Sequence, residues 1–177
     1  MVNYYLVTEL MKNNDAQINS FVEGSDKFTS SVFLHKKRGG KLTFGPLWDF
    51  DIAAGNIDYN GNEDPTGWYI RNSDWHSLLF ANTDFGDRVF SKWCQLQSDG
   101  TIAGLEAQVD TIVASIEPAA IDRNFERWDI LGTKVWPNFF VGNTHAEEVD
   151  YLKKWITDRA AWMNTELVRE NGECPAS

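Results

Sequence analysis

The densest set of chemically active side chains in this sequence is a pair of aspartates separated by one residue. They lie in the run Trp48-Asp49-Phe50-Asp51. In an extended run both carboxylates would point the same way, roughly 6.5–7 Å apart, and would repel each other. A bound Mg²⁺, Mn²⁺ or Ca²⁺ would relieve that repulsion, because hard cations prefer oxygen ligands. The spacing indicates a metal site at Asp49 and Asp51; the alternative is one turn cap and one solvated carboxylate.

Two further aspartates are candidates for a general base. Asp15 ends the run Asn13-Asn14-Asp15, where an expected helix gives way to a polar loop. A carboxylate at such a junction can accept a proton from a reacting hydroxyl, and a simple turn residue has the same position. Asp26 lies in the same loop and competes with Asp15 for this role.

A basic segment follows this loop. Lys36, Lys37, Arg38 and Lys41 surround a Gly-Gly pair in an otherwise acidic protein. Such a segment could contact phosphate, or it could be a solvated turn. It is not a P-loop, because the sequence lacks Gly-x-x-x-x-Gly-Lys-Ser/Thr.

Aromatic residues and histidine give weaker signals. His76 is expected in a loop, where it could be a ligand or a base, or simply structural. Three tryptophans are also expected in loops and could stack on sugars: Trp68, Trp75 and Trp136. Three others fall on helical stripes and are expected in the core: Trp93, Trp128 and Trp155.

The elements that must position these residues are mostly helical. Residues 31–36 and 41–44 predict a β-hairpin whose turn contains Gly39 and Gly40. The expected helices are 3–13, a run starting at Asp84, the stripe 102–116, a short run 121–128, and a final helix to 167 opened by Thr144-x-x-Glu147. The predicted fold class is α+β, mainly helical, with one small hairpin near the N-terminus.

Composition limits the function classes. The 177 residues carry a net charge of −10, which opposes binding to nucleic acids and anionic membranes. The same charge suits cations, neutral sugars or basic partners. No apolar run approaches the ~20 residues of a membrane span. Two distant cysteines make no disulfide framework, so Cys94 is expected as a half-buried thiol and Cys174 as a thiol in the polar tail, 171–177.

Two parts of the sequence resemble the CotH family of atypical kinases, the spore-coat-protein-H type. One is Tyr4-Tyr5-Leu6-Val7-Thr8-Glu9-Leu10 followed by Lys12-Asn13-Asn14-Asp15. The other is Gly39-Gly40-Lys41-Leu42 followed by Gly45-Pro46-Leu47-Trp48-Asp49-Phe50-Asp51 and Gly55-Asn56. Similarity continues through Trp75, Trp93 and Asn124 to Trp128 as far as Arg159 and Trp162, which is nearly the whole chain.

The resemblance implies a protein-kinase-like C-terminal lobe over residues 1–170. Asp49 and Asp51 would bind Mg²⁺ or Mn²⁺ with ATP, with Ca²⁺ as a further candidate, and Asp15 or Asp26 would be the catalytic base. Ser31, or Ser20, would stand where kinases place a metal-binding Asn. Lys41 is a candidate for binding the nucleotide.

The resemblance also implies the biological setting. The parent protein would be a secreted or cell-surface bacterial kinase acting on serine or threonine of a protein. The family's N-terminal lobe, with its phosphate-binding lysine, is not in this sequence, so we expect the chain alone to be inactive. The surface that the absent lobe leaves would favour a homodimer.

Two other functions compete with this interpretation. A non-catalytic cell-surface or carbohydrate-binding module would use the loop tryptophans and would not depend on Asp49. A glycoside hydrolase is disfavoured, because its two carboxylates must flank the scissile bond, and Asp49 and Asp51 would share one side.

Overall fold

The computed structural model describes residues 1–19 and 31–175. Within them the fold is mainly helical, with one two-stranded antiparallel sheet, so the predicted α+β class is confirmed. The protein-kinase-like lobe remains a prediction. In chain order the elements are α1 (Val2–Leu10), β1 (Leu34–Lys36), β2 (Leu42–Phe44), α2 (Asp74–Phe80), α3 (Thr83–Ser98), α4 (Leu105–Ser115), α5 (Pro118–Arg127) and α6 (His145–Asn171).

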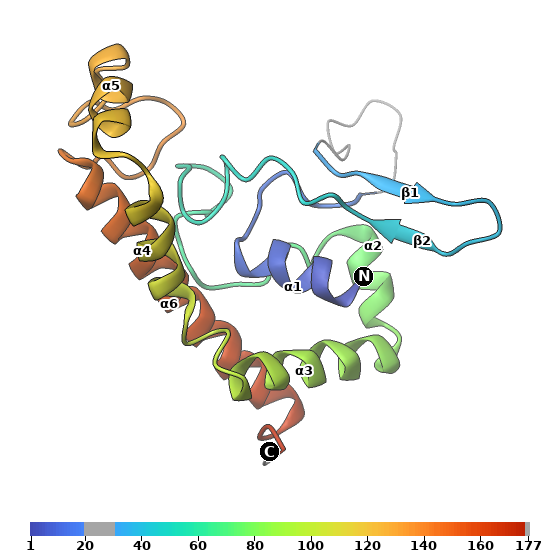
Figure 1. The fold of residues 1–177 in the computed structure, drawn as a ribbon. Coiled ribbons are helices and arrows are strands. Elements are labelled where there is room, and N and C mark those ends of the chain that lie inside the picture. Colours follow the sequence, from blue (N-terminus) through green and yellow to red (C-terminus); the bar gives the residue numbers. More distant parts are fainter. Residues whose placement is uncertain (20–30, 176–177) are drawn as a thin grey trace.

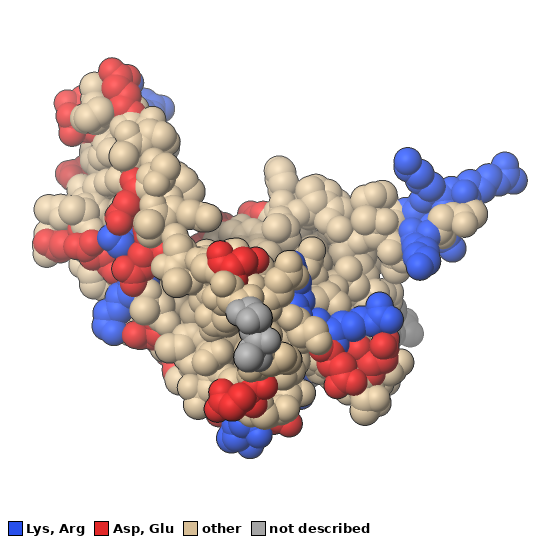
Figure 2. Space-filling model, turned by 60° about the horizontal axis from the view of Figure 1, so that its bottom comes forward, with Lys and Arg blue, Asp and Glu red and all other residues tan. Residues whose placement is uncertain are grey.

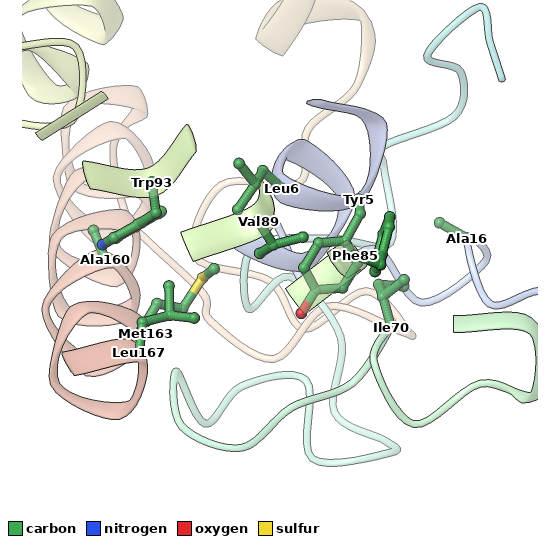
Figure 3. Packing of buried hydrophobic residues seen from close by; sticks show 10 residues of the cluster. All are labelled: Tyr5, Leu6, Ala16, Ile70, Phe85, Val89, Trp93, Ala160, Met163 and Leu167. Carbon is green, nitrogen blue, oxygen red and sulfur yellow. The ribbon is translucent and has the colours of Figure 1, made fainter. Parts of the chain in front are cut away.

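Helix α1 lies at the centre of the molecule, and α3 and α6 pack against it (Figure 1). Its Tyr5 and Leu6 are buried in a core shared with α3 and α6 (Figure 3). Val89 and Trp93 extend this core from α3, and Met163 extends it from α6. Packing against α3 and α6 therefore stabilises α1, and it fixes the C-terminal end of α1, where the polar loop begins.

The hairpin of β1 and β2 projects away from the helices (Figure 1). Leu34 pairs with Phe44 and Lys36 with Leu42, and the Phe44 ring lies 5.2 Å from that of Tyr4 on α1. Gly39 has the left-handed φ of 74° that the turn requires. The predicted hairpin is confirmed, with shorter strands than expected.

Helix α6 is the longest helix, and α4 lies along it (Figure 1). Its predicted start is confirmed, because the Thr144 side chain accepts a hydrogen bond from the Glu147 backbone at 3.2 Å. The core prediction for Trp155 is also correct, since its side chain is buried against Ala54 and Ile156.

The predictions for the region around α2 and α5 need correction. Residues 74–80 form a helix, and His76 lies inside it instead of in a loop. Helix α3 begins after Asn82, which accepts a hydrogen bond from the backbone of Asp84, so Asn82 is the cap. Trp128 is 59% exposed, because α5 contributes no buried side chain to the core.

The two cysteines form a disulfide, contrary to the prediction of two thiols. Cys94 on α3 and Cys174 after α6 have Cα atoms 5.4 Å apart. They are separated by 80 residues, but the end of α6 packs beside α3 through Leu167 and Trp93 in the same core. Tertiary packing brings the pair together, and a sequence pattern does not reveal it.

A buried ion pair joins the first helix to the last. Arg159 of α6 and Glu9 of α1 are both fully buried, with Nη2 2.7 Å from Oε1. The Glu9 carboxylate also accepts the backbone N–H groups of Tyr69 and Arg71, and Arg159 donates to the carbonyls of Pro65 and Gly67. Because both charges are paired and hydrogen-bonded, these contacts offset the cost of removing them from water, and the pair fixes the end of α1.

Backbone carbonyls of the loop after Asp51 surround a second cation, the Lys12 ammonium. Lys12, just beyond α1, donates from Nζ to the carbonyls of Gly61, Asp64 and Thr66 at 2.6, 2.7 and 2.9 Å. Burial lowers the pKa of this ammonium, and the nearby Arg159 lowers it further. The loop is therefore attached to the same end of α1 that carries Asp15.

Candidate functional site

Three of the predicted site residues meet at the end of α1. The Ser31 hydroxyl donates to Asp49 Oδ2 at 2.8 Å and lies 3.4 Å from Asp15 Oδ2. The two carboxylate oxygens are therefore no farther apart than the sum of these distances. Asp15 follows α1, Ser31 precedes β1 and Asp49 follows β2, so three separate segments are brought to one point.

Asn13 holds the backbone of both Asp15 and Asp49. Its side chain is buried, and Nδ2 donates to the carbonyl of Asp49 at 3.1 Å. Its Oδ1 accepts the backbone N–H of Asp15 at 3.0 Å. Asn13 was not predicted as a site residue, and the only signal was its place in the run Asn13-Asn14-Asp15.

Asn14 connects this segment to the loop after Asp51 through further hydrogen bonds. Its Oδ1 accepts from the Tyr69 hydroxyl at 2.7 Å and from Asn60 Nδ2 at 3.0 Å. Its backbone N–H donates to the carbonyl of Ile52 at 3.2 Å. The segment that carries Asp15 is thus bound to the residues that follow Asp51.

The expectation that Asp49 and Asp51 lie in an extended run, with both carboxylates pointing the same way, is wrong. The run is not a strand, and Asp49 has a left-handed φ of 62°, so the alternation of an extended chain does not apply. Asp tolerates this conformation better than most residues do. Asp51 is exposed, and its carbonyl accepts from Asn56 Nδ2 at 2.7 Å. Its role as a metal ligand remains a prediction.

The charges of Asp15 and Asp51 both affect the pKa of Tyr59. The pKa of Tyr59 is raised by burial first and then by the negative charges of Asp15, Asp51 and Asp58. Burial likewise raises the pKa of Tyr69, with Asp15 adding to the effect. The electrostatic field at this end of α1 is therefore negative, which favours a cation.

Lys41 is not part of this meeting point. Lys41 lies between the hairpin turn and β2, whereas Ser31 precedes β1, so they are at opposite ends of the hairpin. In Figure 2 basic side chains gather at one projecting end of the molecule, away from most acidic ones. Asp26, like Ser20, lies outside the described residues, so the choice between Asp15 and Asp26 stays open.

The remaining candidates are His76 and the three tryptophans that were expected in loops. His76 is fully buried, its Nδ1 lies 2.9 Å from Ser73 Oγ, and burial lowers its pKa to about 4. Trp68 packs edge-on against Trp162, with ring centroids 4.8 Å apart. Trp75 is 39% exposed on α2, and Trp136 is 75% exposed. Trp75 thus lies in a helix instead of the predicted loop. Of the three tryptophans, Trp136 offers the most open ring.

The donor set decides which metal the site fits. Mg²⁺ and Mn²⁺ bind nucleotides through one or two carboxylates plus phosphate and water oxygens. Asp49 supplies one such carboxylate, and the Asp15 carboxylate lies across the Ser31 hydroxyl from it. Among residues 1–19 and 31–175 no group of three or more His, Cys, Asp or Glu side chains could hold a metal without other ligands. The residues fit a metal held jointly with phosphate better than a closed calcium site.

The family model described as CotH kinase protein matches residues 1–163. This chain belongs to the CotH kinase family. The match includes Asp15, Ser31, Asp49 and Asp51, and it confirms the resemblance seen in the sequence. No curated protein and no solved structure matches the chain. Family membership makes this a kinase-like protein and favours that function over a carbohydrate-binding module.

Proposed function

We propose that this CotH-family chain carries the metal- and phosphate-binding part of a kinase that transfers phosphate from ATP to serine or threonine of a protein. The observation that carries the proposal is the shared contact of Asp15 and Asp49 with the Ser31 hydroxyl. Phosphoryl transfer needs a metal-binding carboxylate and a second carboxylate that orients the attacking hydroxyl. Two carboxylates from different segments at one point satisfy both needs.

Each residue has a distinct role in this proposal. Asp49 and Asp51 would hold Mg²⁺ or Mn²⁺, which supplies neutralisation of the phosphate charge when bound. Asp15 would accept the hydrogen bond of the acceptor hydroxyl and take its proton. Ser31 fixes Asp49, and Asn13 holds the backbone of both aspartates. Lys41 would contact the nucleotide from the hairpin.

Calorimetric titration with Mn²⁺–ATP tests the metal half of the site. We expect the wild-type chain to bind in the millimolar range or tighter, and Asp49→Asn to weaken binding by about tenfold or more, because one charge-assisted contact is lost. Asp87→Asn, which changes an exposed carboxylate on α3, is the matched control. Equal binding by wild type and Asp49→Asn would refute the assignment.

Phosphate transfer itself requires, in this proposal, the preceding lobe with the phosphate-binding lysine that the resemblance implies. With that lobe supplied, Asp15→Asn and Asp26→Asn can be compared for transfer at saturating Mn²⁺–ATP. The base is the residue whose loss abolishes transfer without changing nucleotide binding. Sedimentation of the chain without that lobe shows whether the predicted homodimer forms.

Export to the cell surface or beyond is also part of the proposal. Disulfides persist mainly in oxidising compartments, and the Cys94–Cys174 bond supports such a location. Across the described residues no helix has both the length and the apolar character needed to cross a bilayer.

A further inference from the structure

Two aromatic rings lie together beside the candidate site. Trp136, in the loop between α5 and α6, is 75% exposed. Its ring stacks on that of Tyr59, with centroids 6.3 Å apart and 21° between the planes. We call Trp136 and Tyr59 the aromatic shelf. Its exposed ring faces are available to a partner.

Backbone hydrogen bonds attach the shelf to the loop that follows Asp51. The N–H of Asp58 donates to the carbonyl of Pro137, and the N–H of Phe139 donates to that of Asn56, both at 3.0 Å. Asn56 in turn donates to the carbonyl of Asp51. In Figure 1 the orange loop before α6 lies next to this teal loop, in agreement with these bonds. The shelf is therefore held in a fixed position relative to Asp51.

The shelf also borders Asp15. Asn60, next to Tyr59 in the chain, donates to the Asn14 side chain, and Asn14 is next to Asp15. The steps from Tyr59 to Asn60 and from Asn14 to Asp15, together with the Asn60–Asn14 hydrogen bond, place the Cα atoms of Tyr59 and Asp15 within about 15 Å of each other. A polyproline II segment rises about 3.1 Å per residue, so about five residues cover that distance.

The polar groups around the shelf determine what it can bind. Asp58 is paired with Lys134 at 2.9 Å, and Asn60 is paired with Asn14. Among the described residues, neither the Trp136 indole N–H nor the Tyr59 hydroxyl has a hydrogen-bond partner. The shelf therefore offers apolar ring faces and two free donors.

These properties match one class of peptide. Polyproline II segments have no internal hydrogen bonds, so their carbonyls accept from a protein, while proline rings stack on aromatic faces. A sugar would need more free polar side chains than the shelf provides.

We propose that Trp136 and Tyr59 bind a proline-containing, polyproline II segment of the protein acceptor, within about five residues of the hydroxyl that receives phosphate. The distance to the hydroxyl rests on the proposed function, which places that hydroxyl at Asp15. Proline at these positions also keeps the preceding residue extended, so an acceptor serine before it would reach the site.

Fluorescence anisotropy without nucleotide tests this binding. The probes are a labelled peptide containing one serine followed by Pro-x-x-Pro and the same peptide with alanine for both prolines. Wild type should bind the proline peptide about tenfold more tightly than the alanine peptide, and Trp136→Ala should lose that preference. Trp128→Ala, which removes another exposed indole at 59% exposure, should keep it.

Nuclear magnetic resonance locates the contact. The Trp136 indole N–H signal should shift on addition of the proline peptide and not of the alanine peptide. Equal affinity for both peptides, or the same loss in Trp128→Ala, would overturn the proposal. So would a Trp136 shift produced by a cello-oligosaccharide or an arginine-rich peptide without one from the proline peptide.

The outcome is separable from that of the proposed function. Asp49→Asn should retain the proline preference, because the shelf does not include Asp49. If Mn²⁺–ATP binding ignores Asp49 while the proline preference depends on Trp136, the kinase assignment fails and the peptide site stands. The reverse pattern removes the peptide site and leaves the nucleotide site intact.

Discussion

Ser31 is the smallest residue of the candidate site and the one that touches both carboxylates. It has a left-handed φ of 47°, as Asp49 has a φ of 62°, so two unfavourable backbone conformations face each other across one hydrogen bond. Such conformations persist where the surroundings determine them strongly, and they are found often at functional sites. At the residue scale the site depends on this arrangement as much as on charge.

Replacing Ser31 therefore has a specific expected effect. Ser31→Ala removes the hydroxyl that orients Asp49, and we expect Mn²⁺–ATP to bind roughly fivefold more weakly, the equivalent of about 1 kcal/mol. Ser98→Ala, which removes an exposed hydroxyl on α3, should change nothing. Calorimetry on both variants measures the difference, and unchanged binding by Ser31→Ala would mean that the hydroxyl has no orienting role.

His76 gives a prediction about acid stability. Burial lowers its pKa to about 4, below the ordinary value of about 6.5 that it regains on unfolding. The unfolded chain thus binds the proton first, and stability is lost as the pH falls from about 6.5 towards 4. Linkage gives a loss of about 2–3 kcal/mol between pH 7 and pH 4.5.

Urea unfolding at several pH values measures this loss. In His76→Gln the pH dependence over that range should become shallower, whereas His35→Gln, on the exposed hairpin, should behave like wild type. The prediction is wrong if His76→Gln and wild type lose the same stability on acidification.

At the scale of elements, the contact between α1 and α6 carries the site. The Glu9–Arg159 pair and the three carbonyls around Lys12 hold the end of α1 and the loop after Asp51 together. Asn13, Asn14 and Asp15 follow directly. The position of the first predicted catalytic residue thus depends on a helix at the other end of the chain.

Breaking this pair should be costly. Glu9→Gln leaves the Arg159 charge buried without its counter-charge, and we expect a loss of about 3–5 kcal/mol in the free energy of unfolding. Glu166→Gln, in the surface pair with Arg169, should cost less than about 1 kcal/mol. Urea denaturation compares the two, and equal costs would contradict a structural role for the buried pair.

The sequence predicted the elements whose apolar residues repeat over several turns, which are α1, α3, α4 and α6. It missed α2, because seven residues containing Asp74, His76 and Ser77 are too few for a helical period to emerge. It also missed the Glu9–Arg159 pair, since nothing local connects residues 150 positions apart. At the site, Asp15, Ser31 and Asp49 were named from the sequence as candidates with separate roles. Their meeting at one point could not be predicted, because it comes from tertiary contacts and a left-handed turn.

At the scale of the whole molecule, the disulfide closes the structure. It links α3 to the segment after α6, so that the long last helix is covalently attached at its C-terminal end. The two cysteines seemed unrelated in the sequence because α4, α5 and all of α6 lie between them. Only the packing of α3 beside the end of α6 brings them together.

Removing the disulfide should lower stability without dispersing the site. We expect Cys94→Ser/Cys174→Ser to lose about 2–4 kcal/mol in unfolding free energy and to retain Mn²⁺–ATP binding at 25 °C. Thermal unfolding with and without dithiothreitol measures the change. Alkylation before reduction is the control, and labelling of either cysteine by iodoacetamide at that stage would contradict the bond.

The Glu9–Arg159 contact also determines when the end of α1 can take its final structure during translation. Arg159 is synthesised 150 residues after its partner Glu9. At about 5–20 residues per second, the end of α1 waits for many seconds without the arginine that neutralises it. Asp15 and Asp49 can therefore be held in their final positions only after Arg159 has been translated, so a nascent chain that ends before Arg159 is open to chaperones and proteases before the candidate site has formed.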